Sequence, residues 1–409
     1  MGNELVRGAA AGGRVYSRTM SKVLSLTGKG APAPQAAPAL NSIEEILAEL
    51  RAGRMVVIMD DEDRENEGDL IMAAERVTPE AVAFMIRHTS GIICVPMEEQ
   101  RLARLELPQM VPVNDEQQRT AFTVSVDVRA GTTTGVSSAD RAATIRALAD
   151  EASVPGDFAR PGHIFPLRPR RGGVLVRAGH TEAAIDLCRL AGCKPVGVLC
   201  EVMNEDGSMA RRPQLEEFAR RHQLKIGTIA DLIRHRLRTE RSVERISEHS
   251  VQTELGEFRL YAYQDRASLE VHVALARGRL DGPETPLVRV HLADTLRDLF
   301  GIHAATRAWT LRAAMQRIAE AGNGVVIVLR QQESARELAD SLRTLAPAAA
   351  AAEAAQARAE GVVLRTFGVG AQILQDLGVK RMRVLSAPKQ MHGISAFGLE
   401  VEGYVGEEG

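Results

Sequence analysis

The sequence has few of the residues on which several classes of protein depend. Aromatic residues make up only 3% of its 409 positions, which argues against a surface on which single-stranded nucleic acid could stack. Four cysteines are too few for a disulfide framework and are typical of a reduced, cytoplasmic chain. The formal net charge is −2, so nucleic acid and anionic membranes are not expected partners. No apolar run reaches the ~18 residues that a membrane-spanning helix needs.

The rest of the composition is that of a globular chain. Hydrophobic residues make up 45% and charged residues 25%, close to the average for soluble domains. At roughly 150 residues per domain, the length predicts two or three domains. Residues 1–40 lack helical or strand periodicity and the apolar segment of a secretory signal, so we expect a disordered extension. We place the first domain at 41–240, a charged linker at 241–250 and a second domain at 251–404.

Both folded regions have the pattern of mixed helix and strand domains. Ser42 and Glu45 form a capping-box pattern that predicts the start of a helix, and Met55–Met59 predicts a buried strand. Short apolar runs then alternate with helical periods, which predicts an α/β or α+β architecture. The alanine-rich stretch from Pro347 to Ala357 is expected to be a helix or a degenerate insertion.

The segment from Asp60 to Asp69 carries seven carboxylates in ten positions. Such a run is usually a solvated acidic loop, but apolar segments on both sides fix its ends. A hard divalent cation with oxygen ligands is the simplest compensator for so many like charges. Arg64 adds one positive charge and a planar fork that suits an oxyanion, and Gly68 allows a close approach to the backbone.

Two Arg-x-Gly-His units follow, Arg160–His163 and Arg177–His180. A single histidine is more often structural than functional. Here each glycine could expose backbone N–H groups to an anion, with an arginine as phosphate partner. Thr181 begins a helical pattern, and a helix N-terminus is a favourable place for a phosphate.

Glu201 is the third candidate, because it interrupts the apolar run from Pro195 to Val202. It is either a general acid or base or a strand-end carboxylate that faces water. The polar run from Gly131 to Arg141 is expected to cap a helix, with a role in lining the site as the alternative. Cysteines 188, 193 and 200 lack a C-x-x-C pair and are expected to be small buried residues rather than zinc ligands.

Six segments between residues 42 and 238 carry a resemblance to a known family: DDEDRENEGDLI, SGIICVP, TTTGVSSADRAATIRAL, RPGHIFPL, RAGHTEAAIDL and VLCEVMNEDGSMAR. In this order and spacing they closely resemble 3,4-dihydroxy-2-butanone 4-phosphate synthase. The resemblance implies a cytoplasmic homodimer with an α+β fold and Mg²⁺ or Mn²⁺ dependence. It also implies a lyase of riboflavin biosynthesis that converts D-ribulose 5-phosphate to 3,4-dihydroxy-2-butanone 4-phosphate and formate.

The resemblance also assigns roles to residues of the acidic segment. Arg64 and Asp69 correspond to substrate-contacting positions. Glu65 corresponds to a position that binds both metal and substrate, and Glu67 is a further candidate to assist the metal through water.

The second group of roles falls on the two histidine units and Glu201. His180 corresponds to the second metal ligand, and His163 and Glu201 correspond to the two positions essential for catalysis. Glu201 also contacts substrate. The segment that holds the sugar phosphate comprises Arg177, Ala178, Gly179, His180 and Thr181. The chemistry fits, because enolisation of a ketose needs a base and a Lewis acid on adjacent oxygens, and no organic cofactor.

Residues 251–404 resemble GTP cyclohydrolase II in the segments VRVH, AMQRIAE, GVVIVLRQ and RTFGVGAQIL. The resemblance implies a second α+β domain. The zinc site of that family uses three cysteines, whose places hold Asp294, Ala305 and Arg307 here. No cysteine follows Cys200, so we expect a domain without zinc or GTP cyclohydrolase activity.

Three functions remain open at this point. The favoured one is a metal-dependent lyase that acts on a small sugar phosphate and carries a degenerate second domain. The alternatives are a bifunctional enzyme that also hydrolyses GTP, and a non-catalytic scaffold of the pathway. The complete acidic segment, both histidines and Glu201 argue against a scaffold, and zinc content with GTP turnover would separate the first two.

Overall fold

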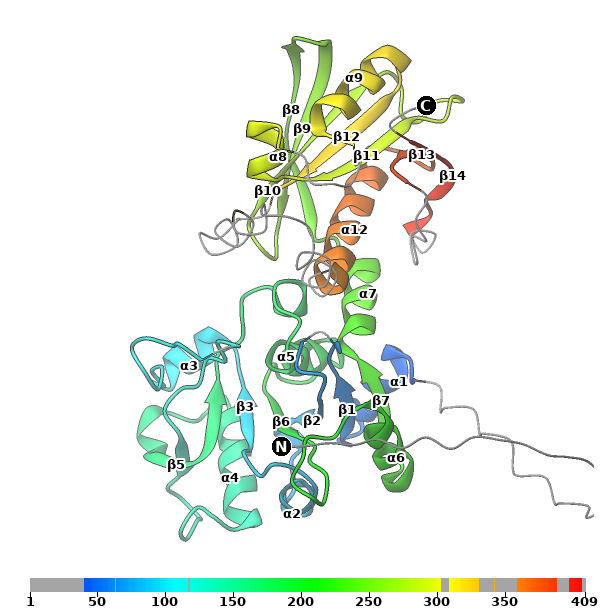
Figure 1. Ribbon diagram of the computed structural model, residues 1–409. Coiled ribbons are helices and arrows are strands. Elements are labelled where there is room, and N and C mark those ends of the chain that lie inside the picture. The colour runs from blue at the N-terminus through cyan, green and yellow to red at the C-terminus, as the bar shows by residue number, and fades with distance from the viewer. Residues whose placement is uncertain are drawn as a thin grey trace, which may run out of the picture. The chain divides into compact units, whose positions relative to one another are not determined.

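The structure is a computed structural model (Figure 1). It describes residues 40–406 except for 63, 117, 303–308, 331–341, 343–358 and 388–396. The expected extension at 1–40 lies outside the described residues apart from Leu40. The alanine-rich stretch from Pro347 to Ala357 also lies outside them.

The first folded region is a mixed seven-stranded sheet with helices. Its strand order is β4-β5-β3-β6-β2-β1-β7. The strands are β1 (Val56–Met59), β2 (Gly68–Ala73), β3 (Cys94–Pro96), β4 (Val126–Val128), β5 (Phe158–Leu167), β6 (Gly197–Glu201) and β7 (Lys225–Thr228). The helices are α1 (Ile43–Arg51), α2 (Pro79–His88), α3 (Glu99–Arg104), α4 (Ser138–Ala149), α5 (His180–Leu190), α6 (Arg212–His222) and α7 (Ile229–Thr239).

Local sequence signals explain where this region begins. The capping box at the start of α1 is confirmed, because the Ser42 side chain accepts from the Glu45 amide while the Glu45 side chain accepts from the Ser42 amide. All four residues of β1 are buried, as expected for a strand covered on both faces. Ser137 caps α4 by accepting from the Asp140 amide, which confirms the capping role expected for the polar run 131–141.

Two strand pairings bring distant parts of the acidic segment and Glu201 together. β1 and β2 are antiparallel, with Met59 opposite Gly68, so residues 60–67 form the connection between them. β2 is also antiparallel to β6, with Asp69 opposite Glu201. The acidic connection and the end of β6 therefore lie at the same edge of the sheet.

The second folded region has its own mixed seven-stranded sheet, of order β14-β13-β11-β12-β10-β9-β8. The α+β class is confirmed for both regions. The strands are β8 (Val243–Thr253), β9 (Gly256–Asp265), β10 (Val271–Arg277), β11 (Leu287–Leu292), β12 (Gly324–Leu329), β13 (Arg381–Leu385) and β14 (Glu400–Val405). The helices among the described residues are α8 (Thr295–Phe300), α9 (Leu311–Ala321) and α12 (Ala359–Asp376).

Part of the range 241–250, assigned to a linker from its charge, belongs to strand β8, which begins at Val243. The strand pairs along its whole length with β9, and most of its side chains are exposed. A strand whose side chains are mostly exposed has the polar composition of a linker. This explains why the sequence predicted a linker where the structure has the start of β8.

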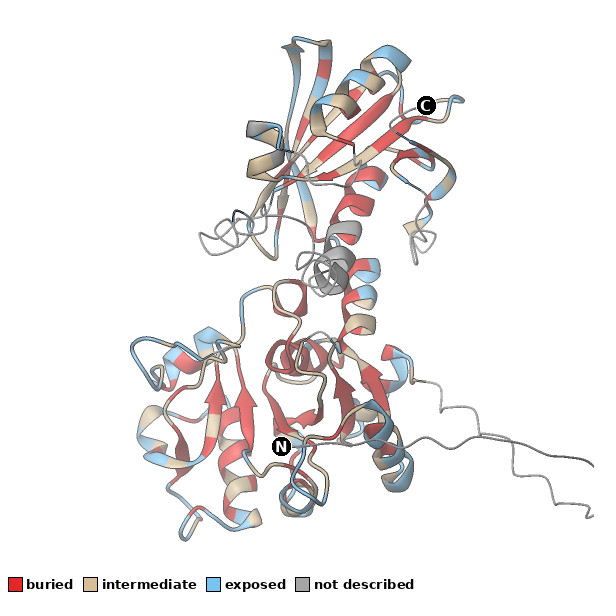
Figure 2. Cartoon of the chain, viewed as in Figure 1, coloured by how far each residue is buried: buried red, intermediate tan, exposed pale blue. Residues whose placement is uncertain are grey.

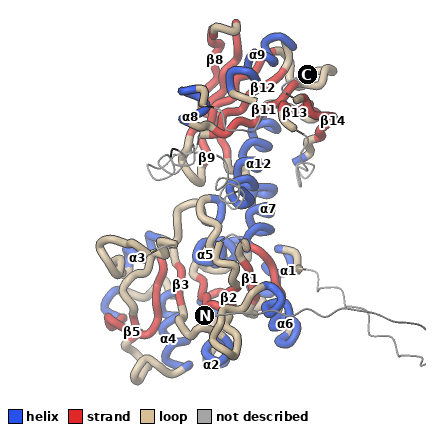
Figure 3. Tube along the Cα trace, in the orientation of Figure 1, coloured by secondary structure: helices blue, strands red, loops and turns tan. Residues whose placement is uncertain are grey.

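Each region has its own hydrophobic core, and Figure 2 shows buried residues concentrated on the sheet strands. The distribution of helix and strand along the chain is drawn in Figure 3. Among the described residues, no helix combines the length and apolar character that spanning a membrane requires.

Candidate active site

The acidic connection is folded around Asp60. Its carboxylate accepts hydrogen bonds from the backbone amides of Glu65 (3.1 Å) and Glu67 (2.8 Å). Arg64 donates to Asp60 at 2.9 Å and to Glu65 at 2.6 and 3.0 Å. The guanidinium fork expected to face a substrate oxyanion is thus engaged within the connection itself, where it offsets two of the negative charges.

His180 is the first residue of α5 and its ring is buried among carboxylates. Nε2 lies 3.1 Å from the carbonyl oxygen of Ile58. A carbonyl can only accept, so Nε2 carries the proton in this contact. Nδ1 lies 3.7 Å from Oε2 of Glu65 and 3.7 Å from Oδ1 of Asp69. A neutral His180 would therefore direct its Nδ1 lone pair toward two carboxylates.

Burial and mutual charge shift the pKa values of these three groups strongly. Burial lowers the pKa of His180, but the charge of Asp69 and the contact with Glu65 outweigh it and raise this pKa to about 9. Burial would raise the pKa of Glu65, yet His180 and Arg64 lower it to about 2. Burial raises the pKa of Asp69 to about 7, against the attraction of His180. His180 is therefore protonated at neutral pH, and its positive charge occupies a position that a metal cation could take instead.

The donor set fits a hard divalent cation. Among the described residues, Oδ1 of Asp69 has no hydrogen-bond partner and is buried, which is costly for a carboxylate unless a cation compensates. Metal-binding histidines commonly donate their other ring N–H to a backbone carbonyl, as Nε2 of His180 does to Ile58. Glu65 and His180, the two predicted metal ligands, lie together.

Asp60 is a third potential ligand that the sequence did not single out. One ligand atom each from Asp60, Glu65 and His180 lies within 4.8 Å of the others. The signal was present, because Asp60 opens the acidic segment directly after β1. Its carboxylate already accepts two backbone amides and Arg64, so its main contribution is to fold the connection.

Glu201 is the last residue of β6 and lies beside this cluster. Ser90 Oγ donates to Glu201 Oε2 at 2.9 Å, and the residue is half-buried. Its negative charge contributes to raising the pKa of Glu67, after the larger effect of burial. The predicted catalytic carboxylate and the predicted metal ligands therefore come together at one edge of the sheet.

The segment 177–181 lies at the start of α5, as the phosphate hypothesis requires. Gly179 precedes the helix and no side chain caps it, so the first-turn amides can face an anion. Arg177, however, is engaged by Glu182 at 2.8 Å and by the carbonyl of Gln118 at 3.1 Å. It orders the segment, and its expected role as a phosphate partner is not apparent in this arrangement.

His163 lies in β5, away from the cluster. Phe165 of β5 is opposite Cys94 of β3, which is opposite Leu199 of β6. His163 is two residues before Phe165, and Glu201 is two residues after Leu199. Because β5 and β6 run in opposite directions, both residues lie on the same side of the paired positions Phe165, Cys94 and Leu199. Two strand spacings, about 10 Å, separate their backbones. Among the described residues, no hydrogen bond or ion pair joins His163 to Glu65, His180 or Glu201.

The amides around His163 are also engaged, contrary to the expectation that they face an anion. The Gly162 amide donates to Ser125 Oγ at 3.1 Å, and the His163 amide donates to Asp127 at 2.9 Å. Ser125, just before β4, and Asp127 within it take up these donors, because Gly162 lets the two backbones approach closely.

In the second region, His291 is buried with Nε2 2.9 Å from both carboxylate oxygens of Asp298. Asp294, at one of the expected zinc positions, follows β11. The other two, Ala305 and Arg307, lie outside the described residues.

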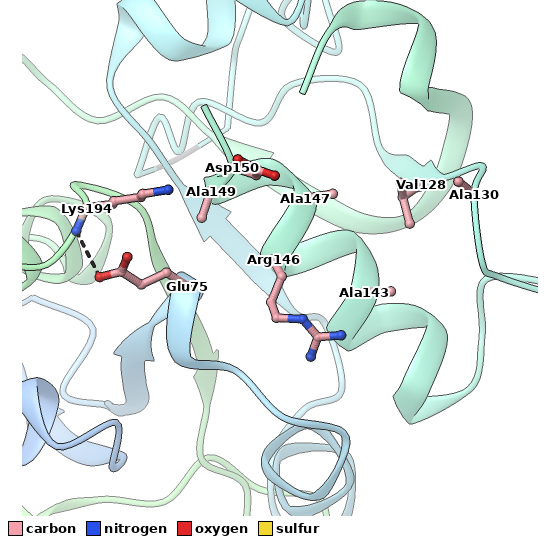
Figure 4. A pocket seen from close by; sticks show the side chains of 9 residues that line it. All are labelled: Glu75, Val128, Ala130, Ala143, Arg146, Ala147, Ala149, Asp150 and Lys194. Atoms are coloured by element: carbon pink, nitrogen blue, oxygen red, sulfur yellow. Dashed lines mark hydrogen bonds between the residues drawn. The ribbon is translucent and has the colours of Figure 1, made fainter. Parts of the chain in front are cut away.

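A surface hollow of about 560 Å³ lies apart from the cluster and shares no residue with it. Figure 4 shows its mixed lining, in which the Lys194 amide donates to Glu75. Arg146 from α4 lines it too and donates to the carbonyl of Val77.

Residues 44–235 match the family model for 3,4-dihydroxy-2-butanone 4-phosphate synthase, and residues 244–406 match the model for GTP cyclohydrolase II. The 3,4-dihydroxy-2-butanone 4-phosphate synthase of Pseudomonas aeruginosa is 52% identical over 370 residues, which cover 90% of this chain and all of the relative. The chain belongs to the 3,4-dihydroxy-2-butanone 4-phosphate synthase family. It is an enzyme, and the family acts in riboflavin biosynthesis.

Two further relatives are similar to this chain over both of its domains. A crystal structure of RibBX, a two-domain 3,4-dihydroxy-2-butanone 4-phosphate synthase from A. baumannii, is 42% identical with a TM-score of 0.77, and covers 89% of this chain and 99% of its own. The bifunctional riboflavin biosynthesis protein RIBA 1 of Arabidopsis thaliana is 47% identical over 375 residues, 90% of this chain and 69% of the relative. The two-domain architecture predicted from the sequence is confirmed.

Proposed function

We propose that the enzyme converts D-ribulose 5-phosphate to 3,4-dihydroxy-2-butanone 4-phosphate and formate, and that its activity depends on Mg²⁺ or Mn²⁺. The observation that carries the proposal is the buried cluster of Glu65, Asp69 and His180 beside Glu201. Glu65, Asp69 and His180 could bind a cation, and Glu201 could act as an acid or base beside them at the same edge of the sheet. Family membership supports the same reaction.

Glu65 and His180 would hold the metal. His180 has its Nε2 proton tied to Ile58 and offers Nδ1, and the low pKa of Glu65 keeps this carboxylate charged. When bound, the metal would supply a Lewis acid toward the oxygens of the sugar. Asp69 and Glu67 contribute negative charge around it, and Asp60 keeps the connection folded.

The remaining site residues bind the sugar and move its protons. Glu201, held by Ser90, acts as the acid or base nearest the cluster. The amides at the start of α5, in segment 177–181, take the phosphate. Asp69 lines the sugar site, and Arg64 does so while it stays paired with Asp60 and Glu65. His163 acts as a second acid or base.

We further propose that the enzyme is a homodimer in solution. His163 lies two strands from Glu201, and apolar side chains nearby remain exposed, including Ile92 (49%) and Val136 (46%). Exposed apolar residues around a site favour contact with another protein surface. Light scattering tests this, and a monomer at micromolar concentration would contradict it.

The second domain is proposed to be catalytically inactive and free of zinc. Support comes from the sequence, in which no cysteine follows Cys200. A site without thiolates and without an activated water cannot attack the purine ring in the way that family requires. The alternative is a bifunctional enzyme. Stoichiometric zinc together with formate release from GTP would establish that alternative.

One assay tests the main proposal. Purified protein is incubated with D-ribulose 5-phosphate, and formate is measured with Mg²⁺, with EDTA, and with EDTA followed by excess Mg²⁺ or Mn²⁺. We expect activity, its loss, and its return. Full turnover by the metal-free protein would contradict the metal dependence, and no formate under any condition would contradict the reaction.

A further inference from the structure

His163 has a partner that the family resemblance did not assign. Asp127, in β4, lies opposite the strand that carries His163. Its Oδ2 is 2.7 Å from Nδ1 of the His163 ring, and its Oδ1 accepts the His163 backbone amide at 2.9 Å. Two contacts from one carboxylate to the amide and ring of the same residue fix the direction of that ring.

The contact also decides which ring nitrogen carries the proton. A carboxylate can only accept, so Nδ1 of His163 must be the donor. In the neutral ring the lone pair is then on Nε2. The His163 side chain is 43% exposed while that of Asp127 is 13% exposed. The carboxylate is therefore on the protein side of the ring, and the accessible part of the ring is available for chemistry.

A glycine-containing turn covers this pair. A Cβ atom at Gly135 would lie 2.1 Å from Oδ2 of Asp127 and 2.9 Å from Nδ1 of His163, and Gly135 has a φ of +84°. Only glycine suits both the conformation and the space. The turn is held by buried Asp140, which accepts from the Gly135 amide at 3.1 Å and from Thr133 Oγ1 at 2.8 Å.

We propose that Asp127 is a positioning residue for catalysis. It keeps His163 in the Nδ1–H tautomer, so that Nε2 can take a proton from the substrate, and it stabilises the imidazolium until Nε2 returns that proton. The inference rests on the proposed role of His163. It gives a function to the polar run 131–141 beyond capping α4, because that run encloses the pair.

The decisive experiment uses the full-length enzyme and the variant Asp127→Asn. An amide can donate to Nδ1, which would favour the other tautomer of His163. Long-range ¹H–¹⁵N correlation spectra of histidine side chains report the tautomer, and His163→Gln assigns the signal among ten histidines. We expect Nδ1–H in the wild type and Nε2–H in Asp127→Asn.

Formate release is measured on the same proteins. We expect kcat of Asp127→Asn to fall about 10²–10⁴-fold, with a small change in KM, since a comparable loss follows when a histidine is held in the wrong tautomer. Asp127→Glu keeps a carboxylate, so it should retain the Nδ1–H tautomer and most of the wild-type kcat. Asp206→Asn, which alters an exposed turn, is the matched control and should resemble the wild type.

The outcomes separate this proposal from the role of His163 itself. An unchanged tautomer in Asp127→Asn, or an unchanged kcat while His163→Ala is inactive, would overturn the positioning role. If Asp127→Asn fails to fold, Asp127→Glu decides, because a wild-type kcat together with the Nε2–H tautomer would also overturn the positioning role. Full turnover by His163→Ala would instead refute the proposed function of His163, whatever the spectra show.

Discussion

The two domains each bury a histidine beside carboxylates, but at different distances. In the first, Nδ1 of His180 stands 3.7 Å from Glu65 and from Asp69. In the second, Nε2 of His291 is 2.9 Å from Asp298. The contact in the second domain has the length of a direct hydrogen bond, whereas the wider spacing in the first domain leaves Nδ1 of His180 between two carboxylates at ion-pair distance.

The difference sets a histidine shared between two carboxylates against a histidine that the Asp298 carboxylate engages directly. The first domain keeps the Asp69 carboxylate buried with its pKa raised to about 7, a feature that a binding site keeps at a cost in stability. In the second domain the direct hydrogen bond between His291 and Asp298 holds α8 against β11. Within the described residues, both sheets have seven strands, and each domain has a buried apolar core.

The largest effect is expected from His180→Ala compared with His291→Ala. The first should lower formate release by on the order of 10³-fold or more and weaken Mg²⁺ binding, because a proposed ligand of the metal is removed. His291→Ala should leave both nearly unchanged. Kinetics and calorimetric Mg²⁺ titration measure this. A comparable loss in both variants would remove the functional distinction between the domains.

Glu201→Gln and His163→Ala refine the same test within the first domain. They should remove turnover but leave Mg²⁺ affinity almost intact, since neither side chain is a proposed ligand, whereas Glu65→Ala should weaken Mg²⁺ binding. Equal loss of metal affinity in all of these variants would contradict the assignment of roles.

The pH dependence of Mg²⁺ binding is the second expected effect. His180 has a pKa raised from 6.5 to about 9, so the metal-free ring is protonated below pH 9 and must lose a proton before it binds metal. Apparent affinity should therefore fall about tenfold for each pH unit from 9 down to 7. Below pH 7, Asp69 begins to take up a proton as well, which steepens the decline.

Calorimetry in buffers with different ionisation enthalpies measures the protons released. Wild type and His291→Ala should each release close to one proton per metal at pH 8, and His180→Gln close to none. In the metal-free protein the raised pKa stabilises the fold fully below pH 6.5, and this stabilisation is lost as the pH rises through 9. An Mg²⁺ affinity independent of pH would contradict the role of His180.

A third comparison asks whether both domains are equally well packed. A Cβ atom at Gly162 would lie 2.0 Å from the Val126 carbonyl carbon, and one at Gly324 would lie 2.5 Å from the Leu287 oxygen. Each substitution by alanine should lower the free energy of unfolding by about 1–3 kcal/mol.

Gly156→Ala and Gly403→Ala are the matched controls, because no described residue has an atom within 4 Å of a Cβ atom at either position. They should change stability by less than about 1 kcal/mol. Denaturant unfolding of the four variants measures this. If Gly324→Ala behaves like its control, the second domain is loosely packed and the comparison of two intact folds fails.

The smallest effect on catalysis is expected from Gln372→Ala. Gln372 in α12 donates to the carbonyls of Leu237 (2.8 Å) and Glu240 (2.9 Å) at the end of α7. The variant should lose on the order of 1 kcal/mol of stability while formate release stays close to wild type.

A truncation after Glu240, which keeps the first hydrophobic core, should also retain the activity. Loss of activity in both proteins while they remain folded would show that the second domain is needed for catalysis.

The local features of this protein could be predicted from its sequence. The capping box of α1, the buried strand β1 and the Ser137 cap of α4 depend on residues a few positions apart, so periodicity and side-chain type suffice to find them. The acidic segment, the two Arg-x-Gly-His units and Glu201 were recognised in the same way, as short motifs. Their assignment to one family needed only their order along the chain.

What the tertiary structure alone decided is how these motifs meet. The pairing of β2 with β6 sets Asp69 opposite Glu201, and the packing of α5 turns Nδ1 of His180 toward Glu65 while Nε2 contacts Ile58, 122 positions earlier in the chain. The pairing of Asp127 with His163, and the engagement of Arg64 and Arg177 by carboxylates, were equally absent from the pattern of residues. Side-chain partners of this kind depend on strand register and helix packing across the whole domain, and a local sequence pattern contains no record of either.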